Sequence, residues 1–210
     1  LGSPTALYLA AAGVGHIIIA DFDQVELSNL QRQIIHQTKD IGEDKVDSAK
    51  NKLTELNPNI KVTIANELIH TDNLSTLIKD VDIVLDGTDN FESRFEINKV
   101  CVDYKKPLVS AAVIRFEGQV SVFKGYEKDQ PCYQCLYTEE GDDNESCVQS
   151  GVLAPVAGLI GTIQALQAIK VILSLGDELC GTLLLVDGLD LSFRKVKIGK
   201  DLKCPICNSN

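Results

Sequence analysis

Residues 17–33 read IIIADFDQVELSNLQRQ, and this stretch decides the fold. Three isoleucines and Ala20 form a short apolar run that ends in Asp21. Strands covered on both faces have such continuous runs, so we predict a buried parallel strand whose carboxyl end carries a carboxylate. Open α/β sheets bind their ligands at that edge. In the polar segment that follows, Ser28 is a candidate helix N-cap, and the amides and guanidinium behind it favour a nucleotide site over a core segment.

On both sides of this stretch, strands alternate with helices. We expect helices over residues 3–12, 44–56, 73–79, 92–104 and 151–175, and strands over 17–21, 60–65, 81–85, 108–113, 119–123, 182–187 and 193–198. The alternation predicts an α/β fold, with a doubly wound, Rossmann-like, mostly parallel sheet and C-terminal antiparallel strands in a single domain over residues 1–210. Ser3 is the expected N-cap of the first helix. A helix that opens after Gly2 is a candidate anion site, with a simple turn glycine as the alternative.

The composition argues against two classes of partner. Thirty acidic and twenty basic residues give a net charge of −10, which disfavours binding to nucleic acid or to anionic membranes. Residues 151–169 carry no charge, but a proline, two glutamines and early glycines favour a buried or dimer-facing helix over a membrane span.

Four of the seven cysteines form two Cys-x-x-Cys pairs, Cys132 with Cys135 and Cys204 with Cys207. This pattern fits metal binding in a reducing compartment better than a disulfide framework, so we expect a cytoplasmic protein. Two such pairs match a closed structural zinc site in which each loop supplies two thiolates. The alternative is two pairs of free or redox-active thiols.

Among the other cysteines, Cys147 precedes the long apolar helix and is a candidate nucleophile, with an incidental loop thiol as the alternative. Cys101 and Cys180 fit buried or incidental positions. The three histidines have no spacing typical of a triad or of metal ligation.

A second strand end also carries carboxylates, because strand 81–85 is followed by DGTDN at residues 86–90. Parallel strands would bring Asp21 and Asp89 to one crevice. Two cations could neutralise a polyphosphate, one carboxylate could accept from ribose hydroxyls, and another could hold Mg²⁺. The candidate residues for this joint site are Asp21, Asn29, Arg32, Lys45 and Asp89.

These motifs resemble the ThiF/MoeB/HesA family of ubiquitin-activating-enzyme-like adenylyltransferases. The resemblance covers essentially the whole chain, through LGSP at 1–4, AAGVG at 11–15, SNLQRQ at 28–33, Lys45, TDN at 88–90, EGQ at 117–119, both cysteine pairs and the helix at 151–170.

The resemblance implies roles for individual residues. ATP would lie against Gly2, Asp21, Ser28, Asn29, Leu30, Gln31, Arg32, Lys45, Asp89 and Asn90, with Asp21 at the ribose and Asn29, Arg32 and Lys45 at the phosphates. Asp89 would hold Mg²⁺, and Cys132, Cys135, Cys204 and Cys207 would hold zinc. Arg32, Lys45 and Asp89 would be catalytic, and Cys147 resembles a position that takes part in thioester or acyl-disulfide chemistry in some members.

The implied reaction is attack by the C-terminal glycine carboxylate of a small ubiquitin-like sulfur carrier, ending in Gly-Gly, on the α-phosphorus of ATP. Pyrophosphate leaves, as in thiamine or molybdopterin biosynthesis. The expected partners are that carrier, a second copy of the chain in a homodimer, and a sulfurtransferase. The family's first strand and glycine-rich loop are expected before Leu1, together with a region that lends an arginine to the partner subunit's site.

Two other functions compete with this one. A nicotinamide-dependent dehydrogenase would use Asp21 equally well, but it leaves Arg32, Lys45 and the four paired cysteines unexplained. A non-catalytic, zinc-stapled module that binds a ubiquitin-like protein has little need of Asp89, Arg32 or Lys45.

Overall fold

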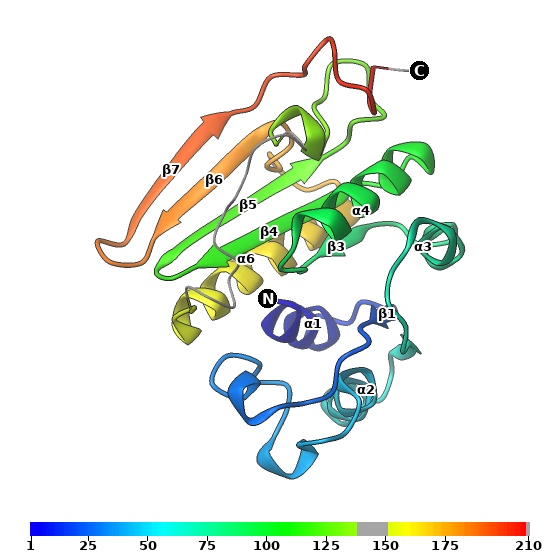
Figure 1. Cartoon of the computed structure of the whole chain (residues 1–210), viewed down its shortest axis with the longest axis vertical. Helices are drawn as coiled ribbons and strands as arrows, with labels where there is room; N and C mark the ends of the chain where they lie inside the picture. Colours follow the sequence, from blue (N-terminus) through cyan, green and yellow to red (C-terminus); the bar gives the residue numbers. More distant parts are fainter. Residues whose placement is uncertain (138–150, 209–210) are drawn as a thin grey trace.

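The computed structural model describes residues 1–137 and 151–208. In chain order its helices and strands are α1 (Gly2–Ala11), β1 (His16–Ala20), α2 (Lys45–Leu56), β2 (Lys61–Ala65), α3 (Thr71–Ile78), β3 (Val84–Asp86), α4 (Phe91–Asp103), β4 (Leu108–Ile114), β5 (Glu117–Phe123), α6 (Ala154–Leu173), β6 (Thr182–Asp187) and β7 (Ser192–Lys197), as Figure 1 shows. Three short 3-10 helices lie at Leu27–Asn29, Thr38–Asp40 and Tyr133–Cys135.

The strands form two sheets. β1 and β2 pair in parallel, and β3, β4, β5, β6 and β7 form a five-stranded sheet in that order. In the larger sheet β3 and β4 are parallel, and the pairs from β4 to β7 are antiparallel. The α/β class with C-terminal antiparallel strands is confirmed, but the parallel pairs lie in separate sheets. β4 and β5 are antiparallel because the connection between them is too short for a crossover helix.

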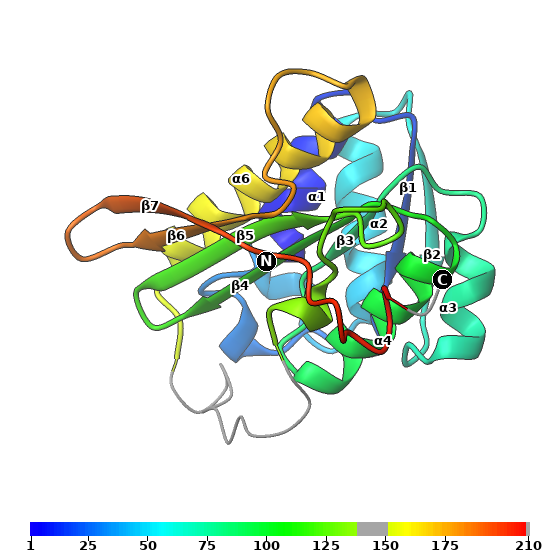
Figure 2. The same ribbon diagram turned by 90° about the horizontal axis from the view of Figure 1, so that it is seen from above.

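Helices cover both faces of the larger sheet (Figure 2). Alternate residues of β4 divide between the faces, since Val109 belongs to the cluster under α6 and Leu108 to the cluster under α4. α1 packs beside α6 so closely that a Cβ on Gly161 would lie 2.5 Å from Pro4 Cγ. The larger sheet is thus held between two apolar layers.

α6 is long and apolar enough to cross a membrane by length and composition. In this fold it is instead a core helix, because Ile160, Ala165 and Ala168 pack into the cluster formed with β4 and β5. The prediction of a buried helix is confirmed for this face.

β1 differs from the prediction. Ile17, Ile18 and Ile19 are only half-buried, so the expectation of a strand covered on both faces is wrong for the residues that the structure describes. Ile17 and Ile19 pack against α1 and α2. The other edge of β1 has no strand partner within residues 1–137 and 151–208.

Candidate functional site

The carboxyl end of β1 gathers one lysine and two aspartates. Asp21 follows the strand directly, and its N–H donates to Ala65 O on β2 at 3.2 Å. Lys45, the first residue of α2, has its Nζ 3.9 Å from Asp21 Oδ2 and 2.6 Å from Asp23 Oδ2. The structure therefore brings Lys45 and Asp21, two of the residues expected at the nucleotide, to the same strand end.

Asp23 was the residue that sequence reasoning missed. Its carboxylate accepts from Lys45 Nζ, its carbonyl accepts from Lys45 N at 2.9 Å, and its N–H donates to Asp21 Oδ1 at 2.9 Å. The signal in the sequence was the second aspartate two residues after the first, a spacing that lets an Asp side chain bond the backbone ahead of it. Asp23 fixes both Asp21 and Lys45.

Burial raises the pKa of Asp21 above its ordinary value of 3.8. The backbone N–H of Asp23 and the charge of Lys45 both oppose this rise. A carboxylate kept partly desolvated gains more from hydrogen-bond donors that reach it, and this suits a group that accepts from hydroxyls.

The segment after Asp23 does not begin the helix that was predicted there. Residues Leu27–Asn29 form one 3-10 turn, and Glu26 occupies the N-cap position that was assigned to Ser28. The assignment of Ser28 as N-cap is wrong, because Asn29 Oδ1 accepts from Glu26 N at 3.2 Å and Ser28 Oγ donates to the Glu26 carboxylate. The side chain of Asn29 is buried and shapes the turn.

Arg32 extends from this turn, and its Nη1 donates to Ser28 O at 3.1 Å while the side chain stays partly exposed. Leu30 is half-buried and Gln31 is exposed. One guanidinium nitrogen of Arg32 is thus bound to the turn, and the side chain as a whole is partly exposed.

Two buried contacts hold the Arg32 segment in place. Ser3 Oγ accepts from Ile35 N at 2.8 Å, which ties the segment to the first turn of α1. Ser3 is therefore not the predicted N-cap, since α1 begins at Gly2. On the other side, Ser48 Oγ on α2 donates to Asp40 Oδ2 and lies 2.7 Å from His36 Nδ1.

His36, Ser48 and Asp40 form a chain with the serine in the middle. Because Ser48 donates its proton to Asp40, His36 Nδ1 must be the donor to Ser48. That order cannot activate the serine as a nucleophile. The chain joins the Arg32 segment to the helix that carries Lys45.

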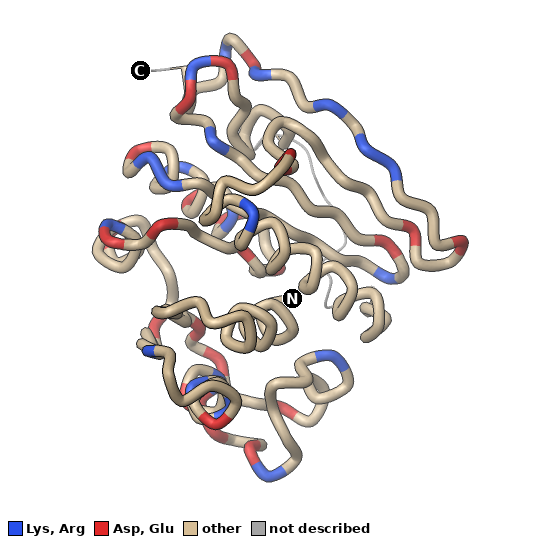
Figure 3. Tube along the Cα trace, turned by 180° about the vertical axis from the view of Figure 1, so that it is seen from behind, with Lys and Arg blue, Asp and Glu red and all other residues tan. Residues whose placement is uncertain are grey.

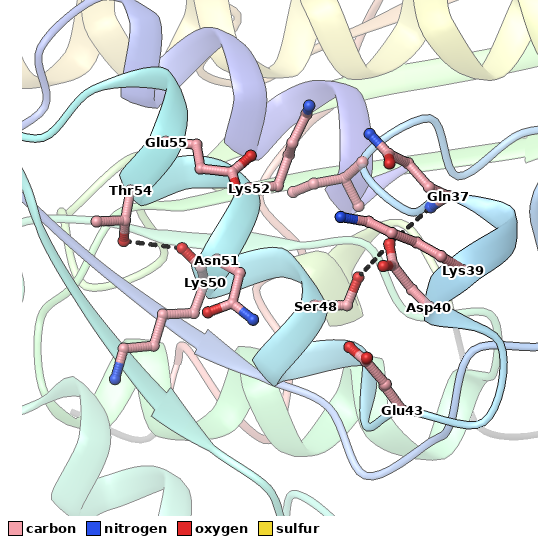
Figure 4. A pocket seen from close by; sticks show the side chains of 11 residues that line it. Gln37, Lys39, Asp40, Glu43, Ser48, Lys50, Asn51, Lys52, Thr54 and Glu55 are labelled. Carbon is pink, nitrogen blue, oxygen red and sulfur yellow. Dashed lines mark hydrogen bonds between the residues drawn. The ribbon is translucent and has the colours of Figure 1, made fainter.

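A hollow of about 530 Å³ lies beside Asp40 and Ser48, between the 35–43 segment and α2 (Figure 4). Its lining includes Lys39, Lys50 and Lys52, but none of the residues predicted to hold the nucleotide. It is therefore a separate feature from the Asp21–Lys45 site.

The second predicted strand end is anchored by a buried aspartate. Asp86 is 1% exposed, and its carboxylate accepts from Thr88 N, Thr88 Oγ1 and Ser110 Oγ. Arg94 Nη2 donates to Thr88 O at 2.6 Å. These bonds fix the backbone that presents the exposed Asp89, and Asn90 caps α4 by accepting from Ser93 N.

Gly2 lies beside this loop. A Cβ built on Gly87 would be 3.2 Å from Gly2 N, so the first turn of α1 and the end of β3 are in contact. A side chain at Gly87 would press against the backbone of Gly2, whereas a Cβ on Gly2 would meet no atom within 4 Å.

The four paired cysteines converge at the far end of the larger sheet. Sulfur distances are 3.9 Å for Cys132 with Cys135, 3.6 Å for Cys132 with Cys204 and 3.4 Å for Cys135 with Cys207, and all four ligand atoms lie within 4.8 Å of one another. Sulfurs at about 2.3 Å from a tetrahedral metal are about 3.8 Å apart. The arrangement fits one metal ion.

The thiols perturb one another at these distances. The contact with Cys135 and burial raise the pKa of Cys132, and the reciprocal contact lowers the pKa of Cys135 to about 5. Burial raises the pKa of Cys207 to about 12. A positive ion among the sulfurs would remove this conflict by favouring the thiolate at every position.

The remaining cysteines divide as follows. Cys101 is buried in α4, Cys180 is partly buried, and Cys147 lies outside the described residues. The role of Cys147 stays a prediction.

Comparison with known proteins identifies a family and several similar proteins. The sequence profile of the ThiF family matches residues 1–206. The chain is 43% identical over 207 residues to "Molybdopterin-synthase adenylyltransferase" of Escherichia coli (strain K12), covering 99% of the chain and 83% of that protein. It is 45% identical over 213 residues to "Adenylyltransferase and sulfurtransferase MOCS3" of Culex quinquefasciatus, of which it spans 48%.

Solved structures agree on the fold. The crystal structure of E. coli MccB with MccA-N7isoASN superposes with a TM-score of 0.86 at 22% identity, over 99% of this chain and 64% of that chain. The chain thus spans less than two thirds of MccB and about half of MOCS3. The match to the family profile and the identities to the curated relatives together lead to one conclusion: the chain belongs to the ThiF family.

Proposed function

We propose that this chain is an ATP-dependent adenylyltransferase, a single domain that activates the C-terminal glycine of a small ubiquitin-like sulfur carrier. The observation that carries the proposal is the placement of Lys45 against Asp21 and Asp23 at the end of β1, with Arg32 on the adjoining segment. Family membership and the names of the relatives support the same activity. The name of the Escherichia coli relative favours a carrier of molybdopterin biosynthesis over one of thiamine biosynthesis.

The reaction needs charge neutralisation more than proton transfer. A carrier carboxylate oxygen forms a bond to the α-phosphorus, the bond from that phosphorus to the bridging oxygen breaks, and pyrophosphate leaves with the electron pair. Negative charge grows on the phosphates, where Arg32 and Lys45 would stabilise it. Asn29 keeps its proposed place beside the phosphates, in the turn whose Ser28 carbonyl binds the Arg32 guanidinium.

Lys45 has a defined resting partner in this scheme. Its ammonium binds Asp23 at 2.6 Å, so a phosphate must compete with that carboxylate. Asp21, half-buried with a raised pKa, would accept from the ribose hydroxyls. The site would thus rearrange one ion pair when ATP binds.

The exposed carboxylate of Asp89 fits Mg²⁺, which prefers oxygen ligands and keeps several waters. Bound there with ATP, Mg²⁺ would neutralise phosphate charge. The four cysteines fit zinc, which favours four thiolates in a closed structural site. This donor set requires a reducing compartment, and we place the protein in the cytoplasm.

We propose that an N-terminal strand and glycine-rich loop complete the domain between β1 and β3. These strands lie in separate sheets, and Gly2 lies at the carboxyl end of β3. A strand that leads into α1 would end at that same edge, parallel to β3, and it would join the two sheets. We further propose a homodimer and a sulfurtransferase partner.

The test is pyrophosphate exchange into ATP by the full-length protein, with a carrier whose C-terminal Gly-Gly is intact or deleted. Exchange is expected only with the intact tail. Asp89→Ala should lower the rate by about 10²-fold or more, since it removes a ligand of the ion that offsets phosphate charge. Glu92→Ala, an exposed carboxylate in the next turn, is the control.

Absence of exchange with an intact carrier would overturn the proposed reaction. Exchange at the full rate in Asp89→Ala would overturn the magnesium assignment alone.

A further inference from the structure

α6 carries a glutamine whose side-chain amide reaches three other elements. Gln164 is 1% exposed, on a helix that is otherwise long and apolar. Its Nε2 donates to Asp86 O on β3 at 2.7 Å and to Val109 O on β4 at 3.0 Å. Its Oε1 accepts from Thr5 Oγ1 on α1 at 2.9 Å. One side chain therefore joins α6 to α1, β3 and β4.

The partners of this amide determine its orientation. The carbonyl oxygens of Asp86 and Val109 can only accept, so the NH₂ group must face the two strands. The amide oxygen then faces α1, where the hydroxyl of Thr5 is a donor. Rotation by half a turn would set the amide oxygen against two carbonyls. The three hydrogen bonds thus satisfy a buried polar group that would be costly without them.

A glycine on α6 allows α1 to come within reach of Gln164. Gly161 and Gln164 are three residues apart, so they lie on the same face of the helix. A Cβ on Gly161 would lie 2.5 Å from Pro4 Cγ and 3.1 Å from Thr5 Oγ1. A larger residue at this position would push α1 away and break the bond between Thr5 and Gln164.

Both segments that Gln164 holds border the proposed nucleotide site. Asp86 is the last residue of β3, and the loop that follows it carries Asp89. On the other side, α1 opens with Gly2. The two segments are in contact, because a Cβ on Gly87 would lie 3.2 Å from Gly2 N. Gln164 therefore binds both sides of this contact.

Asp86 is fixed at its main chain as well as at its side chain. Its carboxylate accepts from Thr88 and Ser110, while its carbonyl accepts from Gln164. The backbone that leads to Asp89 thus starts from a residue held at several points. Displacement of a binding group by about 1 Å can cost about 100-fold in rate, so residues that fix such a backbone matter to the reaction.

We propose that Gln164 is a positioning residue of the nucleotide site, which holds the first turn of α1 and the loop of Asp89 at the separation that ATP requires. This inference rests on the proposed adenylyltransferase function and extends it to a buried residue outside the expected site residues. Gln164 acts through the backbone of β3 and the hydroxyl of Thr5. Its loss should therefore weaken ATP binding through the loop and α1.

A second buried glutamine on the same helix provides the matched control. Gln167 is 6% exposed, and its Oε1 accepts from Leu179 N at 3.0 Å, on the segment that leads to β6. Gln164→Met and Gln167→Met make the same change in shape and polarity. Each leaves at least one buried main-chain group without its hydrogen bond, so both should lower the melting temperature. The measurements on the full-length protein are the Kd of Mg·ATP by calorimetry and the KM and kcat for ATP in pyrophosphate exchange.

Gln164→Met is expected to raise the Kd and the KM for ATP by about 10- to 100-fold, because the loop and α1 are no longer held together. Gln167→Met should keep the Kd and the KM of the unaltered protein despite its lower melting temperature. Unchanged ATP binding in Gln164→Met, or equal losses in both variants, would overturn the positioning role. Absence of exchange in the unaltered protein would overturn the proposed reaction, whereas calorimetry, which needs no carrier, would still decide the role of Gln164.

A milder pair of variants covers the case in which Gln164→Met does not fold. Thr5→Val keeps the shape of the side chain and removes the donor to Gln164 Oε1. The control is Thr162→Val, since the Thr162 hydroxyl donates to Gly158 O of its own helix at 2.8 Å. Thr5→Val is expected to raise the Kd of Mg·ATP by about 3- to 10-fold, the equivalent of one lost hydrogen bond. Equal ATP binding by the two threonine variants would overturn the proposal.

Discussion

Asp21 is a carboxylate whose place in the site costs stability. Burial raises its pKa, so between the unfolded value of 3.8 and the higher folded value the native state binds more protons than the unfolded state. Stability therefore falls as pH rises through this window, and the penalty is fully present at neutral pH. Such penalties are typical of groups kept for function.

Asp21→Asn should therefore raise the melting temperature at pH 7, and the gain should shrink as pH falls toward the ordinary pKa of 3.8. Thermal unfolding followed across this pH range measures the effect. Asp129→Asn, at an exposed position, controls for the loss of one negative charge from a chain of net charge −10. A gain that is equal at every pH would show that desolvation of Asp21 is not its cause.

Gly125 packs against Cys132 so closely that there is no room for a side-chain Cβ. A Cβ on this glycine would lie 2.4 Å from Cys132 Cβ and 3.1 Å from its Cα. Gly125→Ala should displace the metal turn, lowering stability by about 1–3 kcal/mol and weakening zinc retention. Zinc content and denaturant unfolding test this, with Gly199→Ala, which meets no atom within 4 Å, as the comparison. Full zinc content with unchanged stability would contradict it.

Among the elements, α4 joins the two candidate centres. Its N-terminus is capped by Asn90 beside Asp89, its first turns carry Arg94 against Thr88 and Asp86, and its middle carries Asn98 under the cysteine turn. Tyr133, from that turn, packs edge-on against Phe95 and Phe123. One helix therefore contacts both the cysteine turn and the loop that carries Asp89.

Metal removal should loosen this helix as well as the cysteine loops. After chelation, amide hydrogen exchange is expected to rise in residues 132–136 and 200–208, which carry the cysteines. It should also rise in residues 86–98, because the cysteine turn that packs against α4 would no longer be held in place. α2 (Lys45–Leu56) is the internal control, since its packing involves α1 and β2. A rise confined to the C-terminal segment would show that α4 does not transmit the change.

Elements were easier to predict than the contacts between them. α2, α4, β2 and β6 begin and end within about two residues of the expected bounds, because apolar periodicity and local breakers such as Pro58 specify them. Ser28 was misassigned because Glu26 and Asn29 close a tighter turn. Asp23 was missed because its partner, Lys45, is distant in sequence. How deeply β1 is buried depends on which elements pack beside it, and the local sequence pattern does not specify those elements.

At the scale of the whole molecule, charge and apolar surface are unevenly distributed. α1 has no charged residue and α6 has only Lys170, and the two helices lie side by side (Figure 3). Both expose large apolar side chains, with Tyr8 and Leu166 each 54% exposed and Leu173 59% exposed. A chain of net charge −10 repels its copies, so association is favoured on a face that lacks charge.

The proposed homodimer should therefore form through α1 and α6. Leu166→Glu combined with Leu173→Glu is expected to shift the full-length protein from dimer to monomer in light scattering, because each substitution would bury a carboxylate without a partner. Leu189→Glu, at a side chain that is 72% exposed in the turn between β6 and β7, should leave the dimer unchanged. Since both changes are at exposed positions, circular dichroism should show an intact fold. A dimer that persists in the double variant would exclude this face, and loss of the dimer in Leu189→Glu would place the contact on the larger sheet instead.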